Sequence, residues 1–210
     1  MSVEAFILAG GRSSRYGTDK ALMKLQGRSV VDTIAAVIHE ALPESQIRLV
    51  ASGDAQLLSW PFLLPTIFDL YPGHGPWSGL HAALAYAQSD RVFVAACDQP
   101  FISAALIEVL ADRMLDKADA VVPVQKDGRV QPLCAFYRRD ACLRVAEEVV
   151  TANRIAPPLR TMFENVTAVK VGFDEIGELE GSGRFFININ TVPEHENIDP
   201  STPRGESGYT

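Results

Sequence analysis

The stretch ILAGGRSSRYGTDKA, residues 7–21, decides how the rest of the chain is interpreted. An apolar run over residues 5–8 predicts a strand buried on both faces, and it leads directly into adjacent glycines. Arg12, Arg15 and Lys20 follow in the same loop. Glycines let backbone amides approach a phosphate closely, and the three cations would balance its charge. The stretch therefore predicts an anion-binding loop for phosphate at the carboxyl end of the first strand.

This loop differs from two widespread phosphate-binding motifs. A Walker A loop ends in Gly-Lys-Ser/Thr, whereas Gly17 is separated from Lys20 by a Thr-Asp pair. The dinucleotide fingerprint is Gly-x-Gly-x-x-Gly, whereas Gly10 and Gly11 are adjacent and Arg12 follows them. We therefore expect neither a P-loop NTPase nor a nicotinamide-dependent dehydrogenase. A glycine-rich turn with surface arginines remains the alternative interpretation.

Composition limits the classes of partner. The chain has 210 residues, 47% of them hydrophobic, which is enough for one large domain with a full core. Its formal net charge of −7 and pI of about 5.1 argue against nucleic-acid or anionic-membrane partners, which normally meet a basic surface. Three cysteines without a CxxC pair fit a reducing compartment and no zinc site. With no signal peptide or membrane span apparent, we expect a cytoplasmic protein.

Strands alternate with helices through the first half, and this pattern predicts an α/β fold with three layers and a mainly parallel sheet. The Asp-Gly turn within residues 126–129 predicts a hairpin, which makes the second half mixed. The expected strands cover residues 47–52, 66–69, 91–97, 118–124, 132–137 and 166–171, with a late strand or strand-loop over 184–191; the expected helices start at Ser29 and cover residues 80–87, 103–115 and 140–150, with a short one after Pro158.

The domain organisation follows from composition along the chain. We find no composition break inside residues 1–198, so they are expected to form a single domain. Residues 199–210 are polar and rich in Pro, Gly and Ser, which predicts a disordered tail.

Two carboxylates stand at expected strand ends. Asp98 directly follows a buried run, and a carboxylate there is costly without a partner. It is either a magnesium ligand or a residue that caps a helix or braces a loop. Asp69 ends another strand just before a second glycine-rich loop, and it either contacts a nucleotide or is structural. Asn188 and Asn190 alternate in an apolar segment and would share one face, either bracing a loop or completing a metal-phosphate site.

Five ordered motifs then resemble one family. LAGGRSSRYGTDK, GHGPWSGLHAAL, VAACDQPFIS, GRVQPLCAFYRRD and FFININT are similar to the motifs of nucleotidyltransferases that modify molybdopterin, and they span residues 7 to about 194. The closest resemblance is to the molybdenum cofactor guanylyltransferases. Trp77 replaces the family's usual leucine, Ser52 stands where an asparagine often contacts nucleotide, and NTVPEHE replaces NTPED.

The resemblance implies a Rossmann-like nucleotidyltransferase fold and transfer of GMP from GTP to the phosphate of molybdopterin, with release of pyrophosphate. The implied partners are GTP, molybdopterin and proteins of molybdenum-cofactor biosynthesis or insertion; the implied cofactor is Mg2+ at Asp98. The nucleotide-binding candidates are Leu8, Ala9, Gly10, Gly11, Lys20, Ser52, Asp69 and Asp98, and the second-loop or pterin candidates are Gly75, Gly79, Asn188 and Asn190.

The expected chemistry agrees with the residues. A phosphate monoester is already ionised at neutral pH, so its attack on the α-phosphorus needs no strong base. Repulsion between anions is the obstacle, and Lys20, Arg15 and Asp98 with its metal are the catalytic candidates that would relieve it. A CTP-dependent cytidylyltransferase, a sugar-phosphate nucleotidyltransferase and a nucleotide-binding regulator without turnover are the alternatives. Gly10 favours guanine, because the CTP-dependent relatives usually read LAAG.

Overall fold

The computed structural model describes residues 2–9, 23–25, 27–53, 63–114, 117–152 and 154–189. In this part of the chain, seven strands form one sheet in the order β5-β4-β1-β6-β8-β7-β9, and β2 and β3 form a separate two-stranded ribbon. The strands are β1 (Val3–Leu8), β2 (Lys24–Leu25), β3 (Arg28–Ser29), β4 (Gln46–Ala51), β5 (Thr66–Phe68), β6 (Arg91–Ala96), β7 (Ala120–Pro123), β8 (Cys134–Arg138) and β9 (Ala168–Val171). The ribbon of β2 and β3 was not predicted from the sequence.

Six of these seven sheet strands run in one direction. β1 is parallel to both β4 and β6, β4 is parallel to β5, and β7 is parallel to β9. β8 is antiparallel to both of its neighbours, β6 and β7. The predicted mainly parallel sheet with a mixed second half is therefore confirmed. Gly128 has a φ of 84° in the turn between β7 and β8, where the sequence predicted a hairpin.

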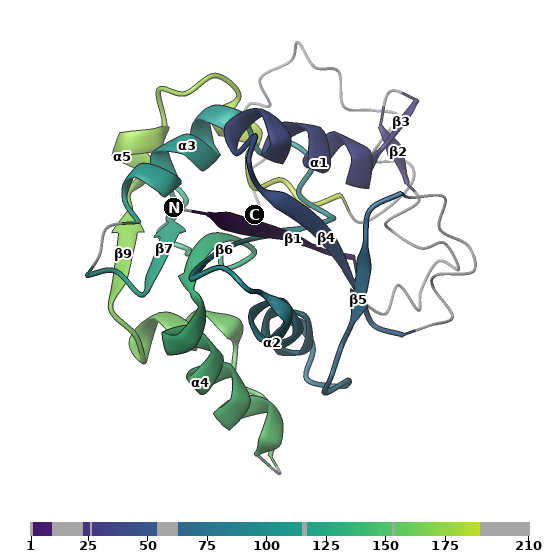
Figure 1. The fold of residues 1–210 in the computed structure, drawn as a ribbon. Coiled ribbons are helices and arrows are strands. Elements are labelled where there is room, and N and C mark those ends of the chain that lie inside the picture. The colour runs from purple at the N-terminus through teal and green to yellow at the C-terminus, as the bar shows by residue number, and fades with distance from the viewer. Residues whose placement is uncertain are drawn as a thin grey trace, which may run out of the picture.

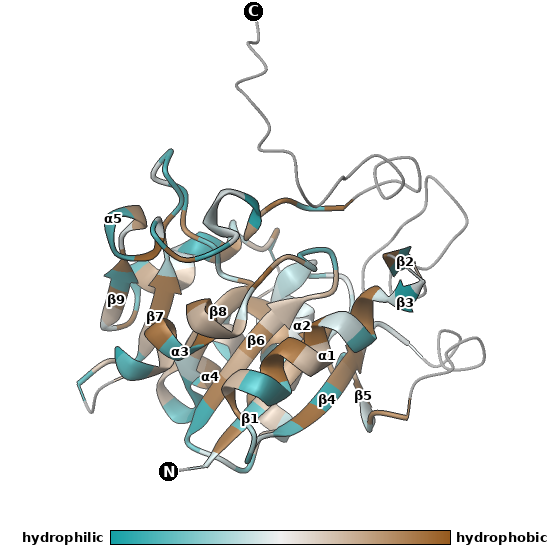
Figure 2. Cartoon of the chain, turned by 90° about the horizontal axis from the view of Figure 1, so that it is seen from above, coloured by the Kyte–Doolittle hydropathy of each residue, from teal (hydrophilic) through white to brown (hydrophobic). Residues whose placement is uncertain are grey.

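Helices cover both faces of the sheet (Figure 1), which confirms the three layers. α1 (Val30–Ala41) and α3 (Ala104–Asp112) pack on one face, and α2 (Pro76–Tyr86) and α4 (Arg139–Thr151) pack on the other. The short helices are η3 (Leu159–Glu164), α5 (Phe173–Ile176) and η4 (Ser182–Arg184). Figure 2 shows that most residues of the central strands are hydrophobic, as expected for a sheet with both faces covered by helices.

The alternation of side chains in β1 explains why two cores exist. Ala5 and Ile7 belong to the cluster beneath α1 and α3, while Phe6 and Leu8 belong to the cluster beneath α2 and α4. All four side chains are buried. The sequence-based expectation that this apolar run is buried on both faces is confirmed.

Two helices begin where the sequence predicted, and one begins earlier. The Ser29 hydroxyl accepts a hydrogen bond from the amide of Asp32 at 3.0 Å, and the Ser103 hydroxyl accepts one from Leu106 at 3.2 Å. The prediction that the second-loop helix starts at residue 80 was wrong, because α2 begins at Pro76. Proline is well tolerated at the first helical position, where its missing N–H would have no intrahelical partner.

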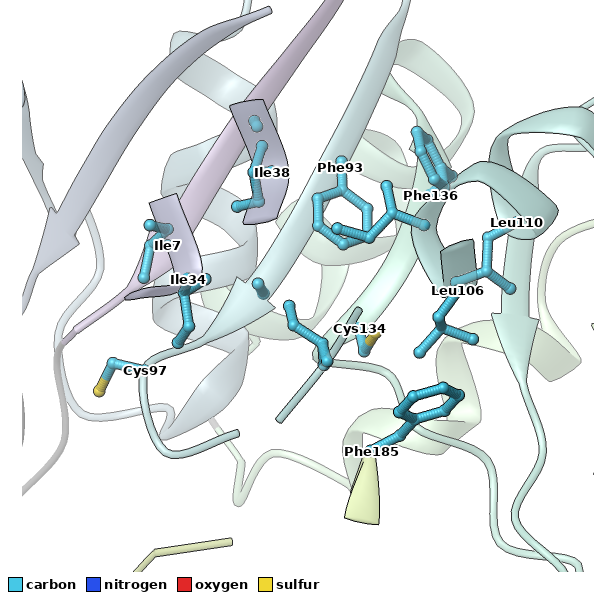
Figure 3. Packing of buried hydrophobic residues seen from close by; sticks show 14 of the residues in the cluster. Ile7, Ile34, Ile38, Phe93, Cys97, Leu106, Leu110, Cys134, Phe136 and Phe185 are labelled. Atoms are coloured by element: carbon cyan, nitrogen blue, oxygen red, sulfur yellow. The ribbon is translucent and has the colours of Figure 1, made fainter. Parts of the chain in front are cut away.

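The segment after η4 is not a strand. Over residues 185–189 the backbone is irregular, so of the two predicted forms, strand or strand-loop, the loop is the better description. Phe185 and Ile189 are nevertheless buried in the cluster beneath α1 and α3, and Figure 3 shows Phe185 near Leu106 and Cys134. The segment is therefore attached to the core by its apolar side chains. The predicted tail over residues 199–210 lies outside the described residues, and the single domain over 1–198 stays a prediction.

Among the described helices, none combines the length and the apolar character needed to cross a membrane. Cys97, Cys134 and Cys142 are all buried and unbridged.

Candidate active site

The carboxyl ends of β5, β4, β1 and β6 meet at one edge of the sheet. The amides of Asp69 and Ala9 donate to carbonyl oxygens of β4 at 3.0 and 2.9 Å, and the amide of Cys97 donates to the last carbonyl of β1 at 3.1 Å. Ser52 directly follows β4, and Asp98 follows Cys97. Hydrogen bonding thus continues one residue beyond the strands and brings four of the predicted segments together. Ligands of open α/β sheets bind at such an edge.

Asp69 is the titratable group with the clearest perturbation at this edge. It follows β5 directly and is half-buried. Partial burial raises the pKa of its carboxyl group from 3.8 to about 6, because a desolvated carboxylate favours the protonated form. At neutral pH the group is therefore mostly ionised, and it can accept hydrogen bonds from a ribose or a base.

Asp98 lies at the centre of the edge, at the end of β6. It is half-buried, and its backbone carbonyl accepts a hydrogen bond from the amide of Ile189 at 2.9 Å. The guanidinium of Arg184 lies 5.2 Å from the ring centroid of Phe101, which attaches the same C-terminal segment to the loop after β6. The suggestion that Asp98 caps a helix was wrong, because Ser103 caps α3.

The second glycine-rich loop, residues 71–79, is held in shape by hydrogen bonds of Ser78. The Ser78 hydroxyl donates to the carbonyl of Tyr71 at 2.7 Å and accepts from the amide of His74 at 3.1 Å. Gly73 and Gly75 have φ angles of 102° and 61°, which residues with side chains rarely adopt. The loop therefore turns sharply and delivers the amino end of α2 to the same sheet edge.

Gly79 allows α2 to pack closely on β1. A Cβ atom added at Gly79 would lie 3.1 Å from Cδ1 of Leu8, closer than ordinary contact. This buried glycine thus holds the helix against the strand that leads into the first loop. Trp77, 1% exposed, packs beneath α2 and donates from Nε1 to the carbonyl of Pro157 at 2.7 Å. Trp77 is therefore a packing residue.

The structure describes the predicted site residue Asn188 but not the candidates in the first loop beyond Ala9. Asn188 is exposed, next to the Ile189 amide that binds the backbone of Asp98, so it lies beside the site. Five site candidates lie outside the described residues, and their placement stays a prediction: Gly10, Gly11, Arg15, Lys20 and Asn190.

One side-chain contact at this edge was not predicted from the sequence. It links the loop after β6 to the loop before β8. Nε2 of Gln99 donates to Oε1 of Gln131 at 3.1 Å, although these residues are 32 positions apart. Gln99 is 4% exposed, and no donor among the described residues bonds its Oε1. Both residues lie inside quoted motifs, CDQP and QPL, but a motif by itself does not indicate that its side chains meet.

His81 was also missed as a buried polar residue. It is 2% exposed on α2, its ring meets Tyr71 edge-on at 5.1 Å, and both ring nitrogens lack a hydrogen-bond partner among the described residues. Burial lowers its pKa, and the carboxylate of Glu147 opposes this shift. This histidine is therefore an interior residue of α2, packed against Tyr71 of the second glycine-rich loop.

Within the described residues, no group of three His, Cys, Asp or Glu side chains could hold a metal ion alone. Mg2+ commonly takes one or two carboxylates and completes its shell with waters and substrate phosphates. A half-buried carboxylate such as Asp98, at the edge where strand ends meet, suits that kind of site.

Comparisons with known proteins agree with this geometry. Residues 5–168 match the family model of the MobA-like NTP transferase domain. The molybdenum cofactor guanylyltransferase of Desulfosudis oleivorans is 31% identical over 205 residues, covering 97% of this chain and 98% of that protein. A Carboxydothermus hydrogenoformans relative, named as a probable molybdenum cofactor guanylyltransferase, is 30% identical and covers 91% and 92% of the two chains.

Solved structures give the same result. The molybdopterin-guanine dinucleotide biosynthesis protein A of Archaeoglobus fulgidus superposes with a TM-score of 0.74 at 25% identity, covering 93% of this chain and 95% of that one. A nucleotidyl transferase of Methanothermobacter shares the fold, with a TM-score of 0.65 at 16% identity and coverages of 92% and 94%. The chain therefore belongs to the MobA-like NTP transferases, and it is a nucleotidyltransferase.

Proposed function

We propose that this enzyme transfers GMP from GTP to the phosphate of molybdopterin. An oxygen of the molybdopterin phosphate forms a bond to the α-phosphorus of GTP, and the bond from that phosphorus to the bridging oxygen breaks, releasing pyrophosphate. The names of the relatives support this reaction. The observation that carries it is the meeting of Ala9, Ser52, Asp69 and Asp98 at one sheet edge, with α2 packed against β1 behind them.

The nucleotide would occupy the part of the edge formed by β5, β4 and β1. Backbone groups of Leu8 and Ala9 would contact it, as would Ser52, whose short hydroxyl side chain replaces the family's usual asparagine. Asp69 would accept hydrogen bonds from its ribose or base, because this carboxyl group is ionised above a pKa of about 6. Gly10 and Gly11 would bring backbone amides to the phosphates.

Neutralisation of the phosphate charges would supply most of the rate enhancement. Lys20 and Arg15 would bind the triphosphate and stabilise the charge that develops around the α-phosphorus. Asp98 would hold Mg2+, which when bound supplies positive charge between the two anionic reactants. The attacking phosphate is already ionised, so the site needs no histidine as a general base.

The acceptor would approach from the side of Asp98 that faces the C-terminal segment. Asn188 and Asn190 are candidates to contact it, and Gly75 shapes the loop at the amino end of α2. Gly79 would act indirectly by setting the distance between α2 and Leu8. Proteins of molybdenum-cofactor biosynthesis or insertion would deliver the acceptor and receive the product.

Nucleotide selectivity tests this proposal first. The wild-type enzyme would be melted with Mg2+ and each of GTP, CTP, UTP and ATP. A ligand at 100 times its Kd adds about 2.7 kcal/mol to the folded state, so selective stabilisation by GTP is expected. Stabilisation by CTP alone would instead identify a cytidylyltransferase. Absence of stabilisation by every nucleotide would contradict the proposed site.

Turnover provides the second test. Pyrophosphate release should require GTP, molybdopterin and a divalent cation together. Asp98→Asn should reduce the rate about 10²-fold or more by removing a metal ligand. The matched control, Asp127→Asn, changes an exposed carboxylate of the hairpin and should leave the rate unchanged. Nucleotide binding without any turnover would favour a regulator.

A further inference from the structure

We propose that Gln131 is a specificity-determining residue for the acceptor, donating a hydrogen bond from Nε2 to an oxygen or nitrogen of its heterocyclic ring, and that Gln99 is the positioning residue that orients it. This inference rests on the proposed function, because it assumes that the acceptor carries a pterin ring.

The topology brings the two carboxamides to the active edge. β8 is antiparallel to β6, with Ala95 opposite Cys134, so residues before Cys134 lie beside residues after Ala95. The amide of Ala96 donates to the carbonyl of Leu133 at 2.9 Å, which extends this pairing. Gln131 and Gln99 therefore meet at the same edge as Asp98, on its far side from β1, β4 and β5.

The backbone around Gln131 is fixed on both sides. Its amide donates to the carbonyl of Pro123 at 3.0 Å, and its carbonyl accepts from the amide of Cys134 at 3.1 Å. The hydroxyl of Tyr137, a fully buried residue, donates to the carbonyl of Pro132 at 2.5 Å. The loop that carries Gln131 is therefore held in one conformation by the two strands it connects, which is what a recognition site requires.

The side-chain hydrogen bond has a direction. Gln99 is buried and donates to Oε1 of half-buried Gln131 at 3.1 Å. This bond fixes the carboxamide plane of Gln131 and occupies one of the two lone pairs of its Oε1, so that its Nε2 hydrogens face the ligand side as donors. Oε1 of Gln99 has no donor among the described residues, and a buried polar atom without a partner calls for an explanation such as a ligand that supplies one.

The neighbourhood favours a heterocycle. Three carboxamides lie near Asp98: Gln99 follows it in the chain, Gln131 is bonded to Gln99, and Asn188 precedes the residue whose amide bonds the Asp98 carbonyl. Neutral carboxamides recognise ring carbonyls and ring nitrogens, whereas phosphate recognition relies on cations and backbone amides. A ligand whose phosphate lies at Asp98, approaching from the β8 side, would place its ring against Gln131.

Steady-state kinetics with the full chain test the inference. Gln131→Leu should raise the KM for molybdopterin about tenfold, the loss of one hydrogen bond, while the KM for GTP changes less than twofold. Gln131→Glu keeps the shape and the acceptor for Gln99 but removes the donor, so it should raise the KM for molybdopterin at least as much. The control Gln88→Leu, at the opposite edge of the sheet, should change neither constant.

A double-mutant cycle tests the positioning role. Gln99→Met should raise the KM for molybdopterin about threefold, and Gln99→Met with Gln131→Leu should be no worse than Gln131→Leu alone, because Gln99 acts through Gln131. Melting temperatures would show that each variant folds; if Gln99→Met does not, the two Gln131 variants decide the question. An unchanged KM for molybdopterin in Gln131→Leu, or an equal rise for GTP, would overturn the inference. A wild-type enzyme without GMP transfer would overturn the proposed function itself.

Discussion

The two halves of the sheet reach the active edge in different ways. In the half formed by β5, β4, β1 and β6, parallel strands deliver their carboxyl ends, so each contributes the residues that follow it: Asp69, Ser52, Ala9 and Asp98. In the other half, β8 runs in the opposite direction and contributes the residues that precede it, including Gln131. The first arrangement is typical of nucleotide sites, and the second would form the surface that we propose for the acceptor.

In the proposed site, the reversed strand β8 separates the surface for the nucleotide from the surface for the acceptor. The nucleotide half depends on close packing, as with Gly79 on Leu8, and on charges from the first loop. The acceptor half depends on hydrogen bonds between loops, as with Gln99 and Gln131. Substitutions in one half should therefore leave the other half's ligand largely unaffected.

The largest expected effect is on turnover. Lys20→Ala should lower kcat by about 10²- to 10³-fold, because it removes a cation from the reacting phosphates, while the melting temperature stays close to that of the wild type. Pyrophosphate release measures it. The matched control is Lys170→Ala on β9, at the far edge of the sheet. Turnover near the wild-type value would remove Lys20 from the mechanism.

Gly79→Val should break the packing of the nucleotide half. The added methyl groups would overlap Leu8 and cost about 3 kcal/mol of unfolding free energy, measured by urea denaturation. The KM for GTP should rise more than the KM for molybdopterin. Gly183→Val is the control, since nothing lies within 4 Å of a Cβ atom there. Equal destabilisation by both variants would show that backbone propensity, rather than Leu8, is responsible.

Trp77→Phe tests a hydrogen bond that connects the two halves of the molecule. Trp77 lies on α2, and its partner Pro157 follows α4. Losing the indole hydrogen bond and part of the ring should cost about 1.5 kcal/mol. Both KM values should stay within twofold, since Trp77 is buried in the core and is not one of the proposed ligand contacts. Denaturation and kinetics on one preparation check this, and a selective rise in one KM would contradict it.

The smallest effect concerns pH. Because the pKa of Asp69 is raised to about 6 in the folded state, folding favours its protonated form. Relative to Asp69→Asn, the wild type should therefore lose stability as pH rises from about 4 to 6, by about 1 kcal/mol at most because solvent screens a half-exposed carboxylate. Melting both proteins across this range measures the difference. Asp127, whose pKa is lowered by Arg129, should give a weaker trend of opposite sign when changed to Asn.

Most of the fold was predictable because its signals are local. Apolar runs identified the strands, and serine caps identified the starts of α1 and α3. The start of α2 was misjudged, since Pro76 and Gly79 look like loop residues unless the packing on Leu8 is known. The final segment is buried by Phe185 and Ile189 without pairing as a strand, so its apolar pattern alone could not distinguish the two.

The site was predictable in part. Residues that follow parallel strands must gather at one edge, which made Asp69 and Asp98 recognisable from sequence. The contact between Gln99 and Gln131 was not predictable, because it depends on the antiparallel register of β8 against β6. His81 was missed for a similar reason: its burial depends on tertiary packing, including the ring of Tyr71.

The hairpin between β7 and β8 has a consequence for protein engineering. Residues 124 and 130 pair across a turn closed by Gly128, so the loop leaves the sheet and returns beside Gln131 without contributing to the parallel half. In the proposed site, insertions or exchanges close to Gln131 would change the acceptor while preserving the nucleotide donor, whereas the tip of the hairpin at Asp127 would tolerate them. The end of this loop beside Gln131 is therefore the place where an engineer would graft a new acceptor preference without disturbing the parallel half of the sheet.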